Sequence, residues 1–167
     1  MTLTTRAETT ITAVQTTTAD LSTPADSLAY SKRIDLASGT GINQADLIFH
    51  DQRTLIASGT EDLDLAGALT DKFGNTITMA RIKGIVVTAA AGNTNNVNVT
   101  RPGSNGVPIF LAAGDGVPVV PGGKFEWWAP SAAGIAVTAG TGDLLTITNS
   151  AGSTGVTYDV IIVGASA

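Results

Sequence analysis

The run TITMARIKGIVVTAA, residues 76–90, is the longest β-rich segment of the chain and indicates how the protein folds. Its apolar side chains alternate with other residues, first at Ile77 and Met79, then, shifted by one residue, at Ile82 and Val86. Because strand side chains alternate between the two faces of a sheet, this shift predicts a bulge or bend near Arg81. Such a bend lets a strand leave one sheet and enter another, so the run favours two packed sheets.

Short strand-like segments separated by turns make up most of the remaining chain. Gly or Pro stands at nearly every break between them, and typical segments are residues 96–100, 124–129, 143–149 and 156–164. No segment repeats apolar residues at the spacing of an amphipathic helix over three turns. We therefore predict an all-β, single-domain β-sandwich that is jelly-roll-like and carries an extended N-terminal arm.

The first part of the chain differs from the rest in composition. Residues 1–24 are polar and rich in Thr, and we predict that they form an arm or edge strand before a sandwich domain of residues 25–167. Such an arm could add a strand to the open sheet edge of a neighbour. The alternative is a frayed terminus. The following segment predicts a half-buried strand, with Lys32 as its one charged misfit and with four apolar residues on one face, Leu28, Tyr30, Ile34 and Leu36.

Composition narrows the classes of function. With 167 residues, the chain is most simply one domain that buries roughly 70% of its unfolded surface. Its formal net charge of −5 opposes general binding to nucleic acid or to an anionic membrane, and we expect neither partner. We identify no signal peptide and no run of apolar residues long enough to span a membrane. The chain has no cysteine, which leaves the redox compartment open.

The residues that could carry chemistry are few and poorly placed. His50 is the only histidine, and no nucleophile turn accompanies it. Asp62 and Asp64 match the start of a calcium-binding loop, but Phe73 stands where the bidentate Glu belongs. The Gly-rich pieces are turns rather than phosphate loops. We therefore predict no catalytic residue, no metal site and no cofactor, and we expect that the protein is not an enzyme.

The only two tryptophans are adjacent, in the segment KFEWWAP of residues 124–130. In a strand they point to opposite faces, so Trp127 is predicted to fill the core with Phe125. Trp128 shares the other face with two charged residues, and it either meets a partner or is covered by loops of its own chain. A basic cluster near the longest strand could meet an acidic partner or be simply solvated. The predicted interface residues are Trp128, Lys124, Glu126, Arg81, Lys83 and Arg101.

Residues 37–167 resemble a known family. The most recognisable parts are DLAGALTDKFG (64–74), PGG (121–123) before an apolar strand, and the tail from AGTGDLL (139–145) to YDVIIVG (158–164). This pattern is similar to that of head decoration proteins, or cement proteins, of tailed bacteriophages. The resemblance implies a β-sandwich or jelly roll that binds the outer capsid surface as a trimer or dimer, and it brings no active site to carry over.

The expected function follows from this resemblance. We expect a virion structural protein, made in the cytoplasm of a bacterial host, that lies on the capsid exterior. It would stabilise the capsid by binding the major capsid protein and itself, with a trimer favoured over a dimer.

Two other classes stay open. A receptor- or glycan-binding module of a phage fibre or tail would expose aromatic side chains to sugars, for which only Tyr30, Tyr158 and the tryptophans are available. An enzyme on a jelly-roll scaffold would normally need several histidines.

Overall fold

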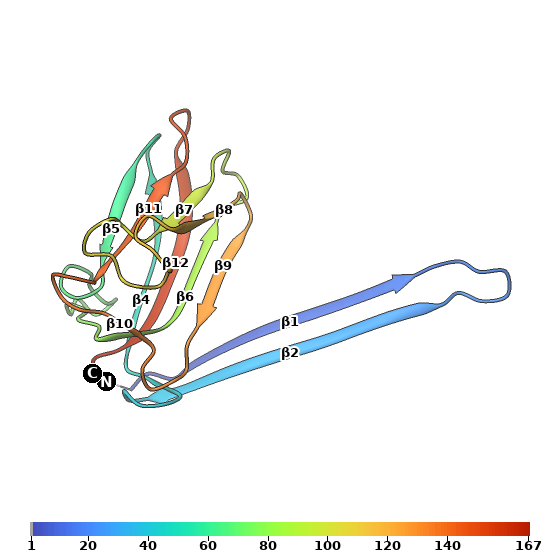
Figure 1. The fold of residues 1–167 in the computed structure, drawn as a ribbon, viewed down its shortest axis with the longest axis horizontal. Coiled ribbons are helices and arrows are strands. Elements are labelled where there is room, and N and C mark those ends of the chain that lie inside the picture. The colour runs from blue at the N-terminus through green and yellow to red at the C-terminus, as the bar shows by residue number, and fades with distance from the viewer. Residues whose placement is uncertain (1) are drawn as a thin grey trace.

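The computed structural model describes residues 2–167 and consists of strands joined by turns and loops, with no helix among these residues. Within this part of the chain, nothing forms a helix that could cross a membrane. The prediction of an all-β sandwich is confirmed, because two antiparallel sheets pack face to face (Figure 1). The strands are β1 (Thr5–Thr16), β2 (Ala25–Ser38), β3 (Gln44–Ala45), β4 (Leu47–Leu55), β5 (Thr60–Asp64), β6 (Arg81–Ala89), β7 (Val97–Thr100), β8 (Gly116–Val119), β9 (Lys124–Trp128), β10 (Ile135–Ala136), β11 (Leu144–Asn149) and β12 (Val156–Ala165).

Strands distant in sequence alternate within each sheet. In the first sheet β12 lies between β4 and β6, and β9 and β10 follow one another along the far edge of β6. In the second sheet the order is β5-β11-β7-β8. The chain therefore crosses from one sheet to the other at β4–β5, β5–β6 and β6–β7, as well as at β8–β9, β10–β11 and β11–β12. This connectivity needs many turns, which explains the frequent Gly and Pro between strands.

The main core lies between the two sheets. Along β12 the inward positions are all buried, at Val156, Tyr158, Val160 and Ile162, and along β11 they are Leu145 and Ile147. This alternation is the period-two pattern that the sequence displays, with each apolar residue facing the opposite sheet.

Strand β6 contains the predicted irregularity, two residues later than expected. Its register with β12 shifts between Gly164, which pairs with Ile82, and Val163, which pairs with Gly84, so Lys83 is the extra residue of a bulge. Ile85 and Val87 face the core after the bulge. The prediction that Val86 shares the core face of Ile82 is therefore wrong, because the bulge reverses the phase once more.

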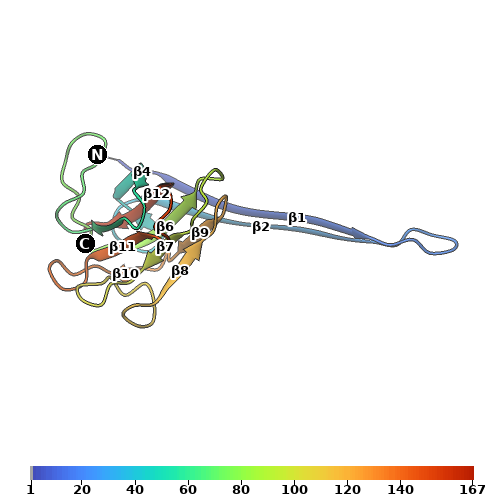
Figure 2. The same ribbon diagram turned by 90° about the horizontal axis from the view of Figure 1, so that it is seen from above.

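The N-terminal region forms a long two-stranded hairpin that projects from the sandwich (Figures 1 and 2). Strands β1 and β2 pair along their whole length, from Thr5 with Leu36 to Thr16 with Ala25. The predicted boundary at residue 24 thus falls in the turn of this hairpin. The prediction that Leu28 and Tyr30 face the sandwich core is wrong, since their side chains are 52% and 48% exposed.

Candidate interaction surface

The outer face of the first sheet is covered at one end by the base of the hairpin. A second, smaller cluster of buried residues forms there from Leu36 of β2, Ala45 of β3 and Val163 of β12. The partly buried side chains packed against it are Leu3, Ile34, Ile48 and Trp128. This cluster fixes the hairpin to the sandwich, because it joins residues of both across the sheet surface.

Trp128 is part of this contact. Its indole lies over Gly84 of the neighbouring strand, and its Nε1–H donates to Oε1 of Glu126 at 2.7 Å. Lys124 forms an ion pair with the same carboxylate. Lys124, together with the indole N–H, holds the pKa of Glu126 below its ordinary value, against the opposing effect of burial. Residues of the same chain therefore cover the Trp128 side chain in part, which is one of the two alternatives given for it.

Trp127 points to the other face of β9, as alternation requires. Its side chain is partly buried and packs against the main core together with Phe125. Sequence reasoning therefore assigned the two tryptophans to the two faces of the sheet correctly.

Lys83 is not a surface residue, so its prediction as part of an exposed interface is wrong. It is fully buried, and its Nζ donates to the carbonyl oxygens of Gly41 at 3.3 Å, Ala132 at 3.0 Å and Ser131. Burial lowers the pKa of Lys83, and the nearby charge of Arg81 lowers it further. The ammonium therefore joins two loops on the hairpin side of the sheet to the bulge in β6.

The other predicted basic residues have different environments. Arg81 is half-buried at the start of β6, where it pairs with Ala136 and Ala165. Arg101 follows β7 in the second sheet, and its Nη1 donates to the carbonyl oxygen of Phe110 at 3.0 Å. The predicted basic cluster is thus divided between the two sheets, and Arg101 orders the loop before β8.

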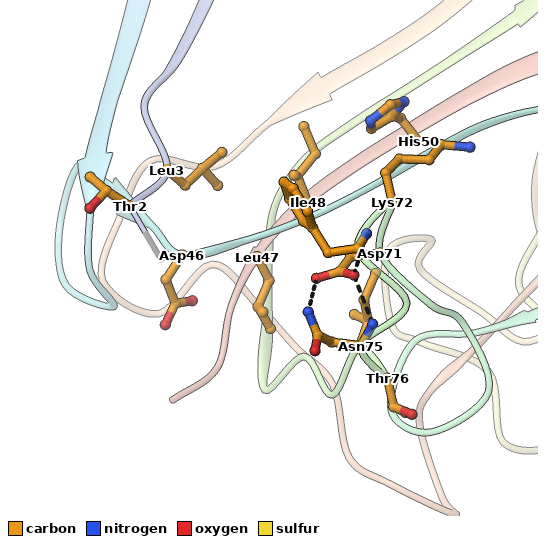
Figure 3. Close-up of a pocket in the computed structure, with 12 residues that line it drawn as sticks. Thr2, Leu3, Asp46, Leu47, Ile48, His50, Asp71, Lys72, Asn75 and Thr76 are labelled. Carbon is orange, nitrogen blue, oxygen red and sulfur yellow. Dashed lines mark hydrogen bonds between the residues drawn. The ribbon is translucent and has the colours of Figure 1, made fainter.

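A groove of about 340 Å³ lies beside the hairpin base, between β4 and the turn of residues 71–75 (Figure 3). Asp71 closes this turn by accepting from the backbone N–H groups of Phe73 and Asn75 and from the Asn75 side chain. These hydrogen bonds lower the pKa of Asp71, and the one from the Asn75 side chain has the largest effect. The groove is lined by Thr2, Leu3, Asp46, Leu47, Ile48, His50, Asp71, Lys72, Phe73, Asn75, Thr76 and Ile77.

The groove brings together few groups that could do chemistry. His50 is exposed on β4, and the Lys72 ammonium that lies near it in Figure 3 is paired with Asp51 at 3.1 Å. The paired carboxylates of the sequence analysis are engaged elsewhere, Asp62 with the Thr146 hydroxyl and Asp64 with the backbone N–H of Ala66. Within residues 2–167, no group of three or more His, Cys, Asp or Glu side chains is placed to hold a metal ion.

Sequence reasoning predicted an apolar face on residues 27–36 but missed the hairpin, whose two faces differ in polarity. One face carries ion pairs, Arg6–Asp35 at 2.9 Å and Arg33–Asp35 at 2.7 Å. On the other face Ile11 is paired with Tyr30, and Ala13 with Leu28. Alternation in both segments, with the turn-forming residues of LSTPAD between them, is a signal that could have identified this hairpin.

Not all of the aromatic side chains considered for sugar binding are exposed to solvent. Tyr158 is buried, and its hydroxyl donates to Glu61 of the opposite sheet, which also pairs with Arg53. Burial, strengthened by the Glu61 carboxylate, raises the pKa of Tyr158 well above its ordinary value. Tyr30 and Phe73 remain as large exposed aromatic residues.

In comparisons with protein-family models, with curated proteins and with solved structures, nothing matched this chain.

Proposed function

We propose that the protein is a virion structural protein that decorates and stabilises the outer surface of a tailed-phage capsid. In this role it binds the major capsid protein and further copies of itself, with a trimer favoured over a dimer. The resemblance of residues 37–167 to phage head decoration proteins supports this role, and so does the architecture of the whole chain.

The long hairpin is the observation that carries the proposal. Its first strand has 12 residues and reaches about 40 Å at about 3.3 Å per residue. Most of the hairpin lies away from the sandwich (Figures 1 and 2). A compact body with an arm of this length can contact a subunit beyond the one on which it sits. Contacts with several subunits at once raise the overall affinity without any single strong site.

The body fits the mechanical part of this role. Apart from the two-residue strand β10, which shares the edge of β6 with β9, the strands of the two sheets follow the orders β4-β12-β6-β9 and β5-β11-β7-β8. We propose that this is a jelly roll, since that fold combines two Greek keys in a double sheet. The inter-sheet contacts of Glu61 with Tyr158 and Arg53 add polar links between the layers. A rigid body of this kind presents its outer surfaces in fixed positions.

The copy number of the chain in purified virus particles tests the proposal. Mass spectrometry would quantify this chain against the major capsid protein. A ratio near one, or a simple fraction such as one third, is the expected result for a protein that covers the capsid lattice. A few copies per particle would instead indicate a fibre, tail or vertex and favour the receptor-binding alternative. Absence from particles would contradict a virion role altogether.

A further inference from the structure

The apolar face of the hairpin is covered by the sandwich at its base and is exposed farther out. At the base, Leu36 is 1% exposed and Ile34 is partly buried against the outer face of the first sheet. Farther out on the same face, Tyr30 and Leu28 are about half exposed, as is Ile11 on the opposite strand. The face that holds the hairpin to its own sandwich thus extends outward beyond the sandwich.

The exposed part of the hairpin lacks a further layer or strand from residues 2–167 of its own chain to stabilise it. An isolated two-stranded hairpin is marginally stable in water, and a third layer or strand usually stabilises it. Cross-strand pairs such as Ile11–Tyr30 supply only about 0.2–1 kcal/mol each. An additional surface that covers the apolar face would stabilise the outer hairpin.

The order of residues along this face indicates what that surface is. From the base outward, the cross-strand rows are Thr9–Lys32, Ile11–Tyr30, Ala13–Leu28 and Gln15–Asp26. The apolar rows are therefore flanked on β2 by a positive charge at one end and a negative charge at the other. The pattern is complementary to itself when it is reversed end to end.

We propose that this face binds the same face of a second copy, with the two hairpins antiparallel. A two-fold axis between the two apolar rows then lays each strand over its own equivalent. Lys32 of each copy meets Asp26 of the other, and Tyr30 meets Leu28, while Ile11 meets Ala13. Each large side chain lies opposite a smaller one, and both charges on the face are paired.

A parallel arrangement is less favourable. Laying the hairpins face to face in the same direction brings Lys32 over Thr9 and Asp26 over Gln15, so neither charge meets an opposite one. The antiparallel arrangement alone uses Lys32, the misfit in the otherwise apolar side of its strand.

The contact is small, which sets its expected strength. The four rows span seven residues of each strand, or roughly 23 Å, on a ribbon about 10 Å wide. The footprint of about 230 Å² per copy is well below that of a stable complex, for which about 1,200 Å² or more is buried in total. We therefore expect a dimer whose population rises with concentration. If this is the only contact between copies, the oligomer is a dimer and not the trimer favoured from the resemblance.

Sedimentation equilibrium of the full chain at low ionic strength tests the proposal, without any capsid present. The wild type is expected to approach the dimer mass as its concentration rises. Lys32→Asp and Asp26→Lys should each stay monomeric, because each places like charges together twice. An equimolar mixture of the two variants should recover the dimer, because every facing pair is then complementary. Arg33→Asp makes the same change of charge on the opposite face and should dimerise like the wild type.

Three results would overturn the antiparallel pairing. One is a wild type that stays monomeric at every concentration. Another is an oligomer that Lys32→Asp and Asp26→Lys leave unchanged, which would place the contact elsewhere. The third is a pair of monomeric variants whose mixture also stays monomeric. None of these bears on capsid decoration, which the copy number in virus particles tests separately.

Discussion

Trp128 and Gly84 are directly paired on neighbouring strands, and the indole occupies the space that a side chain at position 84 would need. A Cβ placed on Gly84 would lie 2.2 Å from ring carbons Cε3 and Cζ3 of Trp128. Because residue 84 of β6 is a glycine, the Trp128 ring can lie against the backbone of this strand. In this position the indole reaches both Glu126 and the small cluster under the hairpin base.

Gly84→Ala should displace the Trp128 ring and destabilise the fold. An added methyl group in a tightly packed site typically costs about 1–3 kcal/mol. Urea denaturation would measure the free energy of unfolding, and tryptophan fluorescence would report the changed environment of the ring. Gly92→Ala is the matched control, because a Cβ there meets no atom within 4 Å. Equal stabilities of the two variants would contradict the assigned packing.

Lys83→Met should destabilise the loops that meet at the β6 bulge. Met keeps the length of the side chain but removes the donor to the carbonyl oxygens of Gly41, Ser131 and Ala132. A hydrogen bond to a charged group contributes about 1.5–3 kcal/mol to the free energy of unfolding, and we expect Lys83→Met to lose at least this amount. Hydrogen exchange should show faster exchange in both loops.

The matched control for Lys83 is Lys72→Met. Lys72 is exposed and pairs only with Asp51, and exposed ion pairs contribute about 0–1 kcal/mol. The role assigned to Lys83 would be contradicted if its replacement cost no more than that of Lys72.

Tyr158 should make the protein sensitive to alkaline pH. Its pKa is raised in the folded state, whereas an unfolded tyrosine loses its proton near pH 10. Above about pH 10 the unfolded chain therefore binds fewer protons than the folded chain, and stability falls as the pH rises. The slope for one such group is about 1.4 kcal/mol per pH unit.

Denaturation of Tyr158→Phe between pH 7 and pH 11 would check this linkage. At neutral pH the variant should be less stable by about 1–3 kcal/mol, because the hydrogen bond to Glu61 is lost. Above pH 10 its stability should fall less steeply than that of the wild type. Tyr30→Phe, which leaves the buried hydroxyl in place, should retain the steep decline. Parallel pH profiles for the wild type and Tyr158→Phe would refute the assignment.

The sandwich was predictable because its rules are local. Alternation along residues 156–164 and a turn at most breaks require strands with one buried face, and few all-β architectures satisfy both. The loop before β8 also follows a local rule, because Asn tolerates positive φ in turns and Asn105 adopts φ of 61°.

The burial of the charged residues was less predictable, because it depends on the loops that cover the outer face of the sheet. Lys83 lies on the hairpin side of the sheet and is buried there by the two loops whose carbonyl oxygens accept from its Nζ. Alternation along a strand predicts the two faces but not which loops cover them. Arg81 and Lys83 are two residues apart, and the structure nevertheless buries one far more than the other.

The hairpin was missed for a different reason. Alternation in residues 27–36 identifies an apolar face, but it does not say what covers that face. In β2 the same face is covered at Leu36 by the sandwich and is uncovered at Leu28, because the strand runs past the edge of the body. The interface assigned from the sequence was accordingly placed around Trp128, whereas Ile11, Leu28 and Tyr30 lie about half exposed on the arm.

Shortening the hairpin should leave the sandwich intact. Replacing residues 10–31 by a two-residue Asn-Gly turn keeps the rows from Thr5–Leu36 to Thr9–Lys32 and removes only exposed residues. The free energy of unfolding of the sandwich should therefore change by no more than about 0.5 kcal/mol. Leu36→Ala, which opens the cluster under the base, should instead cost about 2–5 kcal/mol.

The same shortened protein separates stability from association. If the outer hairpin serves contacts with other molecules, the shortened chain stays folded but loses self-association in sedimentation experiments and incorporation into virus particles. A large loss of stability in denaturation experiments would mean that the outer rows support the sandwich itself. If the shortened chain is stable and still self-associates and enters virus particles, the interface lies elsewhere, and the face around Trp128 and Lys124 is then the candidate.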